Sequence, residues 1–292
     1  MSCAKGELDR RTVSGVGFML LGATLIQWTA ALVIPVFPVI GPSATSAWRF
    51  LLGAVVLLAL SRPHVRHWTR RQWLAALALG AATAFMNQCF YQAIARIPLG
   101  GAVAIEYLGP FCVAALAKRT PKHLALVALA GVGVVALTRP GNGLNVTGVL
   151  FAAGAGVGWA AYVFASHHLG GTTTGFEGLA VSMSIAAMLT LPLSVEASAR
   201  LVHHPDVVVR LLIVAVMAVV LGFGSEFQGL RRLKPSIAGV ILATDPAIAF
   251  FVGWLLLHQS VRGWDVVGLC CVVFAGAGVT YNTSVSESEL AR

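Results

Sequence analysis

The chain contains two similar apolar stretches: residues 74–98, LAALALGAATAFMNQCFYQAIARIP, and residues 211–235, LLIVAVMAVVLGFGSEFQGLRRLKP. They align without a gap, and both end at a proline that opens the next apolar run. Trp28 and Trp159 correspond in a similar way at the first apolar run of each half. We therefore interpret the chain as an internal duplication with a boundary near residues 140–142.

Composition places this duplicated chain in a membrane. Of the 292 residues, 58% are hydrophobic and only 11% are charged, whereas an average soluble domain has about 25% charged residues. Several apolar runs approach the roughly 20 residues that cross a bilayer as a helix. We mark ten such stretches, at residues 14–34, 43–60, 73–95, 98–117, 123–138, 145–166, 176–194, 208–230, 235–257 and 264–281. The sequence thus predicts an all-α polytopic membrane protein with ten transmembrane helices.

The number of spans in each half determines the topology. Because five is odd, the second half must enter the membrane from the opposite side, which gives the inverted repeat common among secondary transporters. We expect residues 1–141 to form the first five-helix repeat and residues 142–292 the second. Fourteen Lys and Arg residues lie in loops on the side of the N-terminus and five on the other side. The positive-inside rule therefore predicts that both termini are cytoplasmic.

Other functional classes fit the sequence poorly. The net charge of +9 comes from basic residues in short loops, whereas nucleic-acid binding needs them on one solvated face. Four of the five cysteines lie inside apolar runs, which is typical of packing residues and not of a metal or disulfide framework. We find no zinc, nucleotide-binding or nucleophile motif in a span. We therefore expect no metal, no cofactor and no catalytic residue, and keep an intramembrane enzyme as the less favoured alternative.

Four acidic or basic residues lie well inside the ends of the predicted spans: Arg49, Glu106, Glu226 and Asp245. An ionisable side chain at the bilayer centre costs about 2.5–3.5 kcal/mol on insertion scales, so each needs a partner or a function. At 1.5 Å per residue, Arg49 and Glu106 lie about 9 Å and about 12 Å from the same side of the membrane. We hypothesise that these two side chains form a pair.

Glu106 and Arg49 each have a functional and a structural interpretation. Glu106 can carry protons across the membrane or bind a substrate ammonium group, or it can be a structural charge neutralised by Arg49. Arg49 can bind a substrate carboxylate, or it can serve only to orient Glu106. The sequence leaves both alternatives open.

The two remaining carboxylates are also ambiguous. Asp245 is about 15 Å from the inner side, near the midplane, and is followed by Pro246. It can take part in binding, or it can bond to the backbone groups that a broken helix leaves free. Glu226 lies near the inner end of its span, where Arg231 or Arg232 can neutralise it.

Uncharged polar and aromatic side chains lie at similar depths in the spans. We expect them to shape a polar cavity, although interhelical hydrogen bonding explains any single one of them equally well. The residues are Gln88, Tyr91, Tyr107, Trp159 and Tyr162.

Three motifs point to a known family. Residues 90–110 read FYQAIARIPLGGAVAIEYLGP, with an intramembrane glutamate followed by Gly-Pro. Arg49 stands in TSAWRFLLG and Glu226 in SEFQGLRRL. Over nearly the whole chain these motifs resemble the ten-span drug/metabolite transporter superfamily, EamA type, and within it the RhtA-like threonine/homoserine exporters.

The resemblance implies a proton-driven exporter of small amino acids in the bacterial inner membrane, with two inverted five-helix bundles around a central cavity. Its partners would be the lipid bilayer, a small zwitterionic substrate and protons as coupling ions. Export of another metabolite or a drug is the alternative within the same superfamily. The sequence leaves open the substrate, the direction and stoichiometry of transport, and whether the chain works as a monomer or a homodimer.

The chain departs from the family pattern at two places in the ninth span. The usual Glu-Pro is Asp245-Pro246 here, which keeps the charge and shortens its reach by one methylene group. The usual Gly-Glu at the end of that span is His258-Gln259. The consequence of these replacements is left open by the sequence.

Overall fold

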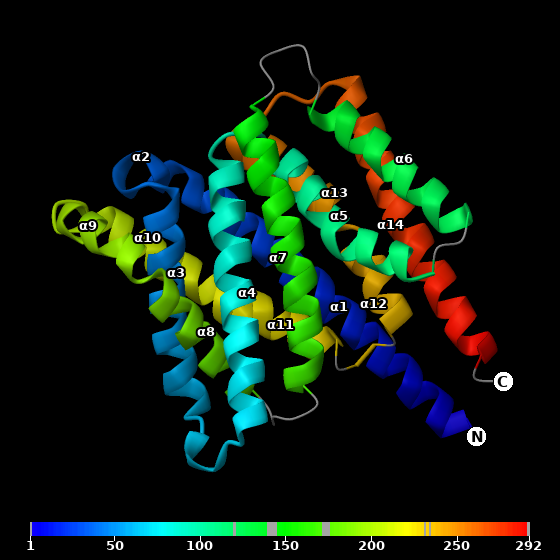
Figure 1. Ribbon diagram of the computed structural model, residues 1–292, viewed down its shortest axis with the longest axis horizontal. Coiled ribbons are helices and arrows are strands. Elements are labelled where there is room, and N and C mark those ends of the chain that lie inside the picture. The colour runs from blue at the N-terminus through cyan, green and yellow to red at the C-terminus, as the bar shows by residue number, and fades with distance from the viewer. Residues whose placement is uncertain are drawn as a thin grey trace. The chain divides into compact units, whose positions relative to one another are not determined.

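The computed structural model describes residues 2–118, 121–138, 145–170, 176–230, 232–233 and 235–290. Every regular element within these ranges is a helix (Figure 1), which confirms the all-helical prediction. The physical reason is that lipid offers no hydrogen bonds to the backbone, so an apolar segment must pair its own N–H and C=O groups.

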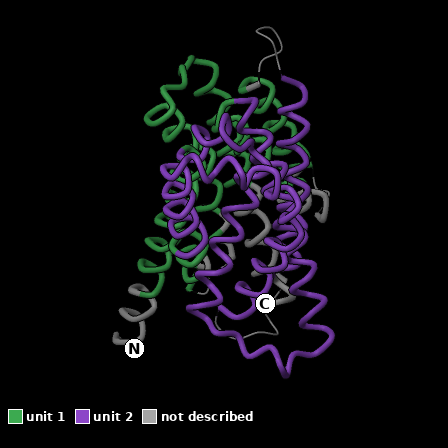
Figure 2. The backbone as a smooth tube through the Cα atoms, turned by 90° about the vertical axis from the view of Figure 1, so that its left-hand side faces the viewer, with its two compact units in different colours: residues 1–31, 98–144, 221–292 green, residues 32–97, 145–220 purple. Residues whose placement is uncertain are grey.

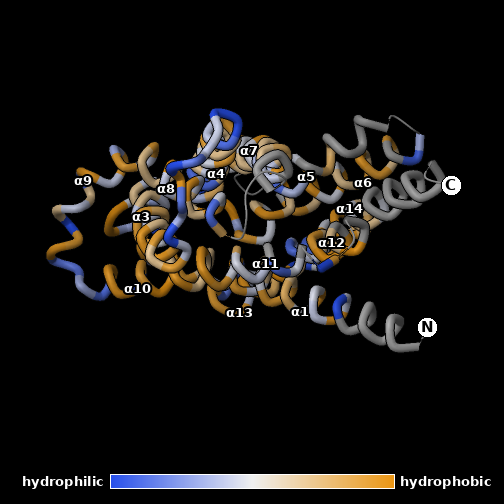
Figure 3. The backbone as a smooth tube through the Cα atoms, turned by 90° about the horizontal axis from the view of Figure 1, so that it is seen from below, coloured by the Kyte–Doolittle hydropathy of each residue, from blue (hydrophilic) through white to orange (hydrophobic). Residues whose placement is uncertain are grey.

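Many of these helices have the length and composition of membrane spans, and Figure 3 shows that most of their residues are hydrophobic. Within the described ranges, six helices are long and apolar enough to cross: Arg11–Ile40, Pro42–Ser61, Arg70–Ile94, Val146–Ser166, Pro205–Glu226 and Val240–Leu257. A seventh span results if Glu177–Thr190 and Pro192–Leu201, bent by 78°, count as one. Shorter apolar helices at Leu99–Gly109, Leu124–Leu137 and Gly263–Gly278 overlap the remaining predicted stretches. The protein is therefore a multi-pass membrane protein, and the count of ten spans and the orientation of the termini stay predictions.

The chain forms two compact units, shown in Figure 2, and each draws segments from both halves of the sequence. Unit 1 comprises residues 1–31, 98–144 and 221–292, and unit 2 comprises residues 32–97 and 145–220. The division into repeats at residues 141 and 142 stays a prediction, because repetition in sequence and grouping in space are different properties.

Unit 2 is built around the long helix α4, Arg70–Ile94, which packs along α7, Val146–Gly170. The two backbones approach closely because α7 has glycines at the contact. A Cβ added at Gly158 would lie 2.8 Å from the Cα of Met86. The other elements of this unit are η1 (Ile34–Val36), α2 (Phe37–Ile40), α3 (Pro42–Ser61), η2 (Val65–His67), α8 (Glu177–Thr190), α9 (Pro192–Leu201), α10 (Pro205–Ala215) and most of the π-helix η3 (Val216–Gly222).

Unit 1 also depends on glycine contacts between helices. Its elements are most of α1 (Ser2–Val33), then α5 (Leu99–Lys118), α6 (Pro121–Thr138), α11 (Phe223–Leu230), α12 (Pro235–Leu242), α13 (Asp245–Leu257) and α14 (Gly263–Leu290). Helices α6 and α14 meet at Gly133 and Gly268, where a Cβ on either residue would lie 2.7 Å from the carbonyl oxygen of the other. On α1, a Cβ at Gly22 would lie 2.9 Å from the backbone nitrogen of Glu226.

The glycines of α6 give a matched test of this packing. Gly133→Ala should lower the stability by about 1–3 kcal/mol, because overpacking a close contact costs that much. Gly131→Ala is the control, since nothing in the described chain lies within 4 Å of a Cβ there. We expect the unfolding temperature in detergent to fall for the first variant only. An equal fall for both variants would contradict the close contact at Gly133.

Candidate functional site

Three of the predicted carboxylates belong to unit 1, although they come from three different helices. Glu106 lies on α5, Glu226 on α11 and Asp245 at the start of α13. Asp245 is buried, while Glu106 and Glu226 are half-buried. Both glutamates interact electrostatically with Asp245. The structure therefore brings these three sequence-predicted residues into one acidic cluster.

Asp245 lies where its span is broken between α12 and α13. Proline lacks an N–H and cannot continue a helix without loss, and Pro246 follows Asp245 directly. The carbonyl of Ile241 at the break accepts bonds from the N–H and the hydroxyl of Thr244, at 2.9 Å and 2.6 Å. The backbone at the break is therefore bonded by Thr244 and does not depend on the Asp245 carboxylate.

The Asp245 carboxylate instead faces Tyr107, the neighbour of Glu106 on α5. The Tyr107 hydroxyl donates to Oδ2 of Asp245 at 3.4 Å. The other oxygen, Oδ1, is buried and has no hydrogen-bond partner in the described chain. Since a buried charged oxygen without a donor is costly, this atom is a candidate ligand-binding atom.

Glu226 follows the π-helix η3, an irregularity that often marks functional sites. Sequence analysis offered Arg231 or Arg232 as a neutralising partner. In the structure, Arg232 donates to the backbone and side-chain oxygens of Gln228, at 2.7 Å and 2.8 Å, and lies over the Phe18 ring. Arg231 lies outside the described residues. Arg232 is thus engaged with the last turn of α11, which precedes it, and with a ring of α1.

A buried cationic side chain lies in unit 2. Arg49, on α3, is 4% exposed, and its Nη2 donates to Oδ1 of Asn87 on α4. The guanidinium carbon lies 5.3 Å from the centre of the Phe50 ring and 5.0 Å from that of Tyr91, and aromatic faces attract a cation at this distance. The predicted pair of Arg49 and Glu106 stays a prediction, because the two residues belong to different units.

A second polar contact joins α3 and α4 near Gln88. Its Nε2 donates to the carbonyl of Ser43 at 3.2 Å, and Gln92 donates to the hydroxyl of Ser43 at 2.7 Å. Sequence analysis did not select Ser43 or Gln92. The available signal was the spacing of Gln88 and Gln92, which lie one helical turn apart and so face the same neighbour.

The two α7 residues of the predicted set are placed differently. Tyr162 packs against an apolar cluster formed by Ala76, Leu79 and Val181. Trp159 is half-buried and follows Gly158, where α7 touches α4. The cavity role proposed for both residues stays a prediction.

The structure gives Gln259 a definite role. His258 adopts a left-handed conformation with φ of 51° and ends α13. Gln259 then folds back so that its Oε1 accepts a bond from the backbone N–H of Leu99 at 3.3 Å. The absence of a side chain at Gly253 makes room for this amide, because a Cβ there would lie 2.5 Å from the Gln259 oxygen. Gln259 therefore caps α5, the helix that carries Glu106.

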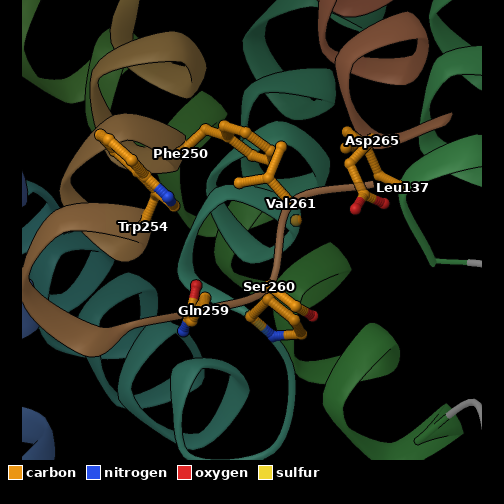
Figure 4. Close-up of a pocket in the computed structure, with 9 residues that line it drawn as sticks. Leu137, Phe250, Trp254, Gln259, Ser260, Val261 and Asp265 are labelled. Carbon is orange, nitrogen blue, oxygen red and sulfur yellow. The ribbon is translucent and has the colours of Figure 1, made fainter. Parts of the chain in front are cut away.

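A small pocket lies beside this cap, and Figure 4 shows Gln259 at its wall together with Trp254 and Asp265. Its volume is about 50 Å³, which suits a few water molecules and not an amino acid. The lining residues are Pro98, Gly101, Leu137, Phe250, Trp254, Gln259, Ser260, Val261 and Asp265. No group of three or more His, Cys, Asp or Glu side chains in the described ranges is arranged to hold a metal ion.

Comparison with known proteins gives consistent results. The EamA-like transporter family matches residues 13–138 and again residues 146–281. The threonine/homoserine exporter RhtA of Salmonella typhimurium strain LT2 is 31% identical over 265 residues, covering 90% of this chain and 90% of its own. RhtA of Escherichia coli K12 is 30% identical over 275 residues, covering 93% and 92%.

Two further matches are more distant. The uncharacterized transporter YwfM of Bacillus subtilis strain 168 is 26% identical over 254 residues, covering 81% of this chain and 85% of its own. One crystal structure matches with a TM-score of 0.62 at 20% identity, covering 96% of this chain and 99% of that one. At that identity the similarity shows the fold alone.

The cap on α5 can be tested by substitution. Gln259→Ala should destabilise the protein by about 0.5–1.5 kcal/mol, the net contribution of one hydrogen bond. Gln259→Glu should keep the stability, because a carboxylate also accepts the Leu99 N–H and is favoured at a helix N-terminus. Ser260→Ala is the control at the exposed neighbouring position. Equal unfolding temperatures of Gln259→Ala and Gln259→Glu in detergent would disprove the cap.

Proposed function

The chain belongs to the EamA-like transporter family, and from this premise we propose that it exports a small zwitterionic amino acid in exchange for protons. Its relatives with about 30% identity over most of their length are named threonine/homoserine exporters. Threonine and homoserine are therefore the first substrates to test. The family and these relatives are transporters, which agrees with a function in transport and not in catalysis.

The observation that carries this proposal is the distribution of charge in the spans. The acidic cluster of Glu106, Glu226 and Asp245 belongs to unit 1, and the buried Arg49 belongs to unit 2. An amino acid carries an ammonium group and a carboxylate. The spans of the chain thus contain both kinds of charged group that would bind the two ends of such a substrate.

Coupling to protons rests on the acidic cluster. Carboxyl groups inside membrane spans are rare and costly, and in pumps and transporters they commonly carry protons. Glu106 would take up a proton or the substrate ammonium group alternately, while Tyr107 holds Asp245 by its hydroxyl. The exchange of one cation for the other at the same carboxylates couples export to proton entry.

The location follows from the same premise. We propose that the protein lies in the bacterial inner membrane with both termini in the cytoplasm, where the basic loops are retained. Export would proceed by alternating access, as in other transporters with inverted repeats.

A drug or a different metabolite is the second candidate substrate, because about 30% identity to the threonine/homoserine exporters leaves room for another substrate within the family. A lipophilic cationic drug would use the acidic cluster and leave Arg49 unused. Competition of threonine flux by zwitterionic, cationic and neutral compounds distinguishes the two candidates. Inhibition by lipophilic cations alone would favour the second.

Glu106→Gln should abolish threonine and homoserine flux driven by a pH gradient in proteoliposomes, because the amide cannot carry a proton. Folding should be retained, as judged by expression and gel filtration. Glu196→Gln is the matched control, since Glu196 is exposed and pairs only with Arg200 on its own helix in the described chain. Normal gradient-driven flux in Glu106→Gln would remove this residue from the mechanism.

A further inference from the structure

The interface between α3 and α4 contains buried polar atoms that are not used by the structure. Oγ of Ser46, Nε of Arg49 and Oε1 of Gln88 are buried without a hydrogen-bond partner in the described chain, and the buried hydroxyl of Tyr91 interacts there only with Arg49. The side chains of Ser46 and Tyr91 are 0% exposed. In folded proteins such atoms are few, and each one requires an explanation.

These atoms lie between two hydrogen-bonded contacts of the same helix pair. At one end, Ser43 accepts bonds from Gln88 and Gln92, and at the other end Arg49 donates to Asn87. Ser46 and Arg49 are three residues apart on α3, as are Gln88 and Tyr91 on α4, so each pair shares one helix face. The four atoms therefore belong to one region of the α3–α4 interface.

Their chemistry indicates an anionic ligand. Arg49, Tyr91 and Ser46 supply an N–H and two hydroxyls, all of which can donate, and one of them is charged. A planar carboxylate accepts several such bonds and matches a guanidinium group in shape and charge. Oε1 of Gln88 accepts, which suits an ammonium or hydroxyl group next to that carboxylate.

The described part of unit 2 offers no carboxylate of its own at this place. Its acidic residues are Glu177, Glu196 and Asp206. Glu177 lies near His64 at 4.0 Å, Glu196 pairs with Arg200 at 3.7 Å, and Asp206 is in the first turn of α10. Arg49 is therefore balanced within this unit by an amide oxygen and two rings, and not by a full negative charge.

We propose that Arg49, Tyr91 and Ser46 form a carboxylate subsite within unit 2, and that Asn87 is the residue that positions Arg49 for it. Nδ2 of Asn87 donates to the carbonyl of Thr83 at 3.1 Å, which turns Oδ1 toward the guanidinium. Oδ1 then holds Nη2 and leaves Nε to the ligand. This inference rests on the proposed function for the identity of the substrate but not for the binding of a carboxylate.

The first experiment measures binding without transport. The purified full-length protein in detergent is heated with acetate or with acetamide, its neutral isostere, and with threonine or threoninamide. We expect the carboxylate of each pair to raise the unfolding temperature and the amide to have little effect. Equal shifts from acetate and acetamide would overturn the subsite.

Point variants then locate the binding. Ser46→Ala removes a hydroxyl that has no partner in the described chain, and Tyr91→Phe removes one that interacts only with Arg49 there. Folding should therefore be retained in both variants while the apparent affinity for the carboxylate falls about tenfold. Ser184→Ala is the matched control, because that hydroxyl bonds only the carbonyl of Ala180 on its own helix in the described ranges. Unchanged affinity in Tyr91→Phe and Ser46→Ala would mean that these atoms bind only water.

Variants of Asn87 distinguish a role in positioning Arg49 from a purely structural role. Asn87→Asp keeps an acceptor for Arg49 and places a negative charge beside it, so stability should be kept while carboxylate binding is lost. Asn87→Leu removes the acceptor, and the KM for threonine should rise with little change in kcat. If Asn87→Asp binds acetate and threonine as the wild type does, Asn87 has only a structural role and the proposal fails.

The outcomes also separate this inference from the proposed function. If wild-type protein binds acetate through Arg49 but neither threonine nor homoserine is transported, the substrate assignment fails and the subsite stands. If threonine is transported and its flux is insensitive to Tyr91→Phe, Ser46→Ala and Asn87→Asp, the subsite fails and the exporter stands.

Discussion

The cost of placing charge in a hydrocarbon environment governs this structure. Among the described buried residues, Arg49 and Asp245 are the ones with a basic and an acidic side chain. Each is held by a polar side chain from a neighbouring helix, Asn87 in one case and Tyr107 in the other. Neither neighbour supplies the opposite charge, so the energetic cost of desolvating Arg49 and Asp245 is only partly offset. This incomplete compensation is what a binding protein needs, because a fully neutralised charge has little to offer a ligand.

The helices are shaped to present these charges. The break between α12 and α13 places Asp245 at the start of a helix, while Thr244 bonds the carbonyl at the break. The π-helix η3 precedes Glu226, and Gly22 lets α1 approach the backbone of Glu226 closely. Backbone irregularity inside a membrane is tolerated where polar groups are satisfied or line a cavity. Each of these two irregular segments precedes or contains a carboxylate of the acidic cluster.

Sequence reasoning succeeded where physical constraints are local. Apolar runs of span length become helices whatever their neighbours are. The depths of Glu106 and Asp245, which come from counting residues along the spans, stay predictions. The cap of Gln259 on Leu99 could not be predicted, since it depends on how α13 ends relative to α5. The contact of Arg49 with Asn87 likewise needs the register of α3 against α4. The compact units were also missed, because a repeat in sequence does not say which spans pack together.

The separation of charge between the units bears on what the protein transports. A lipophilic cation would neutralise carboxylates such as Glu106 or Asp245 and leave Arg49 buried with no anion, so that its desolvation would stay only partly offset. An anionic substrate would neutralise Arg49 and leave the carboxylates without a cation. A zwitterion contains both polarities in one molecule and carries no net charge through the bilayer. Export of a small amino acid therefore leaves the protein less charge to neutralise than export of a cation or an anion. The presence of both acidic and basic residues in the spans thus favours an amino acid as the substrate.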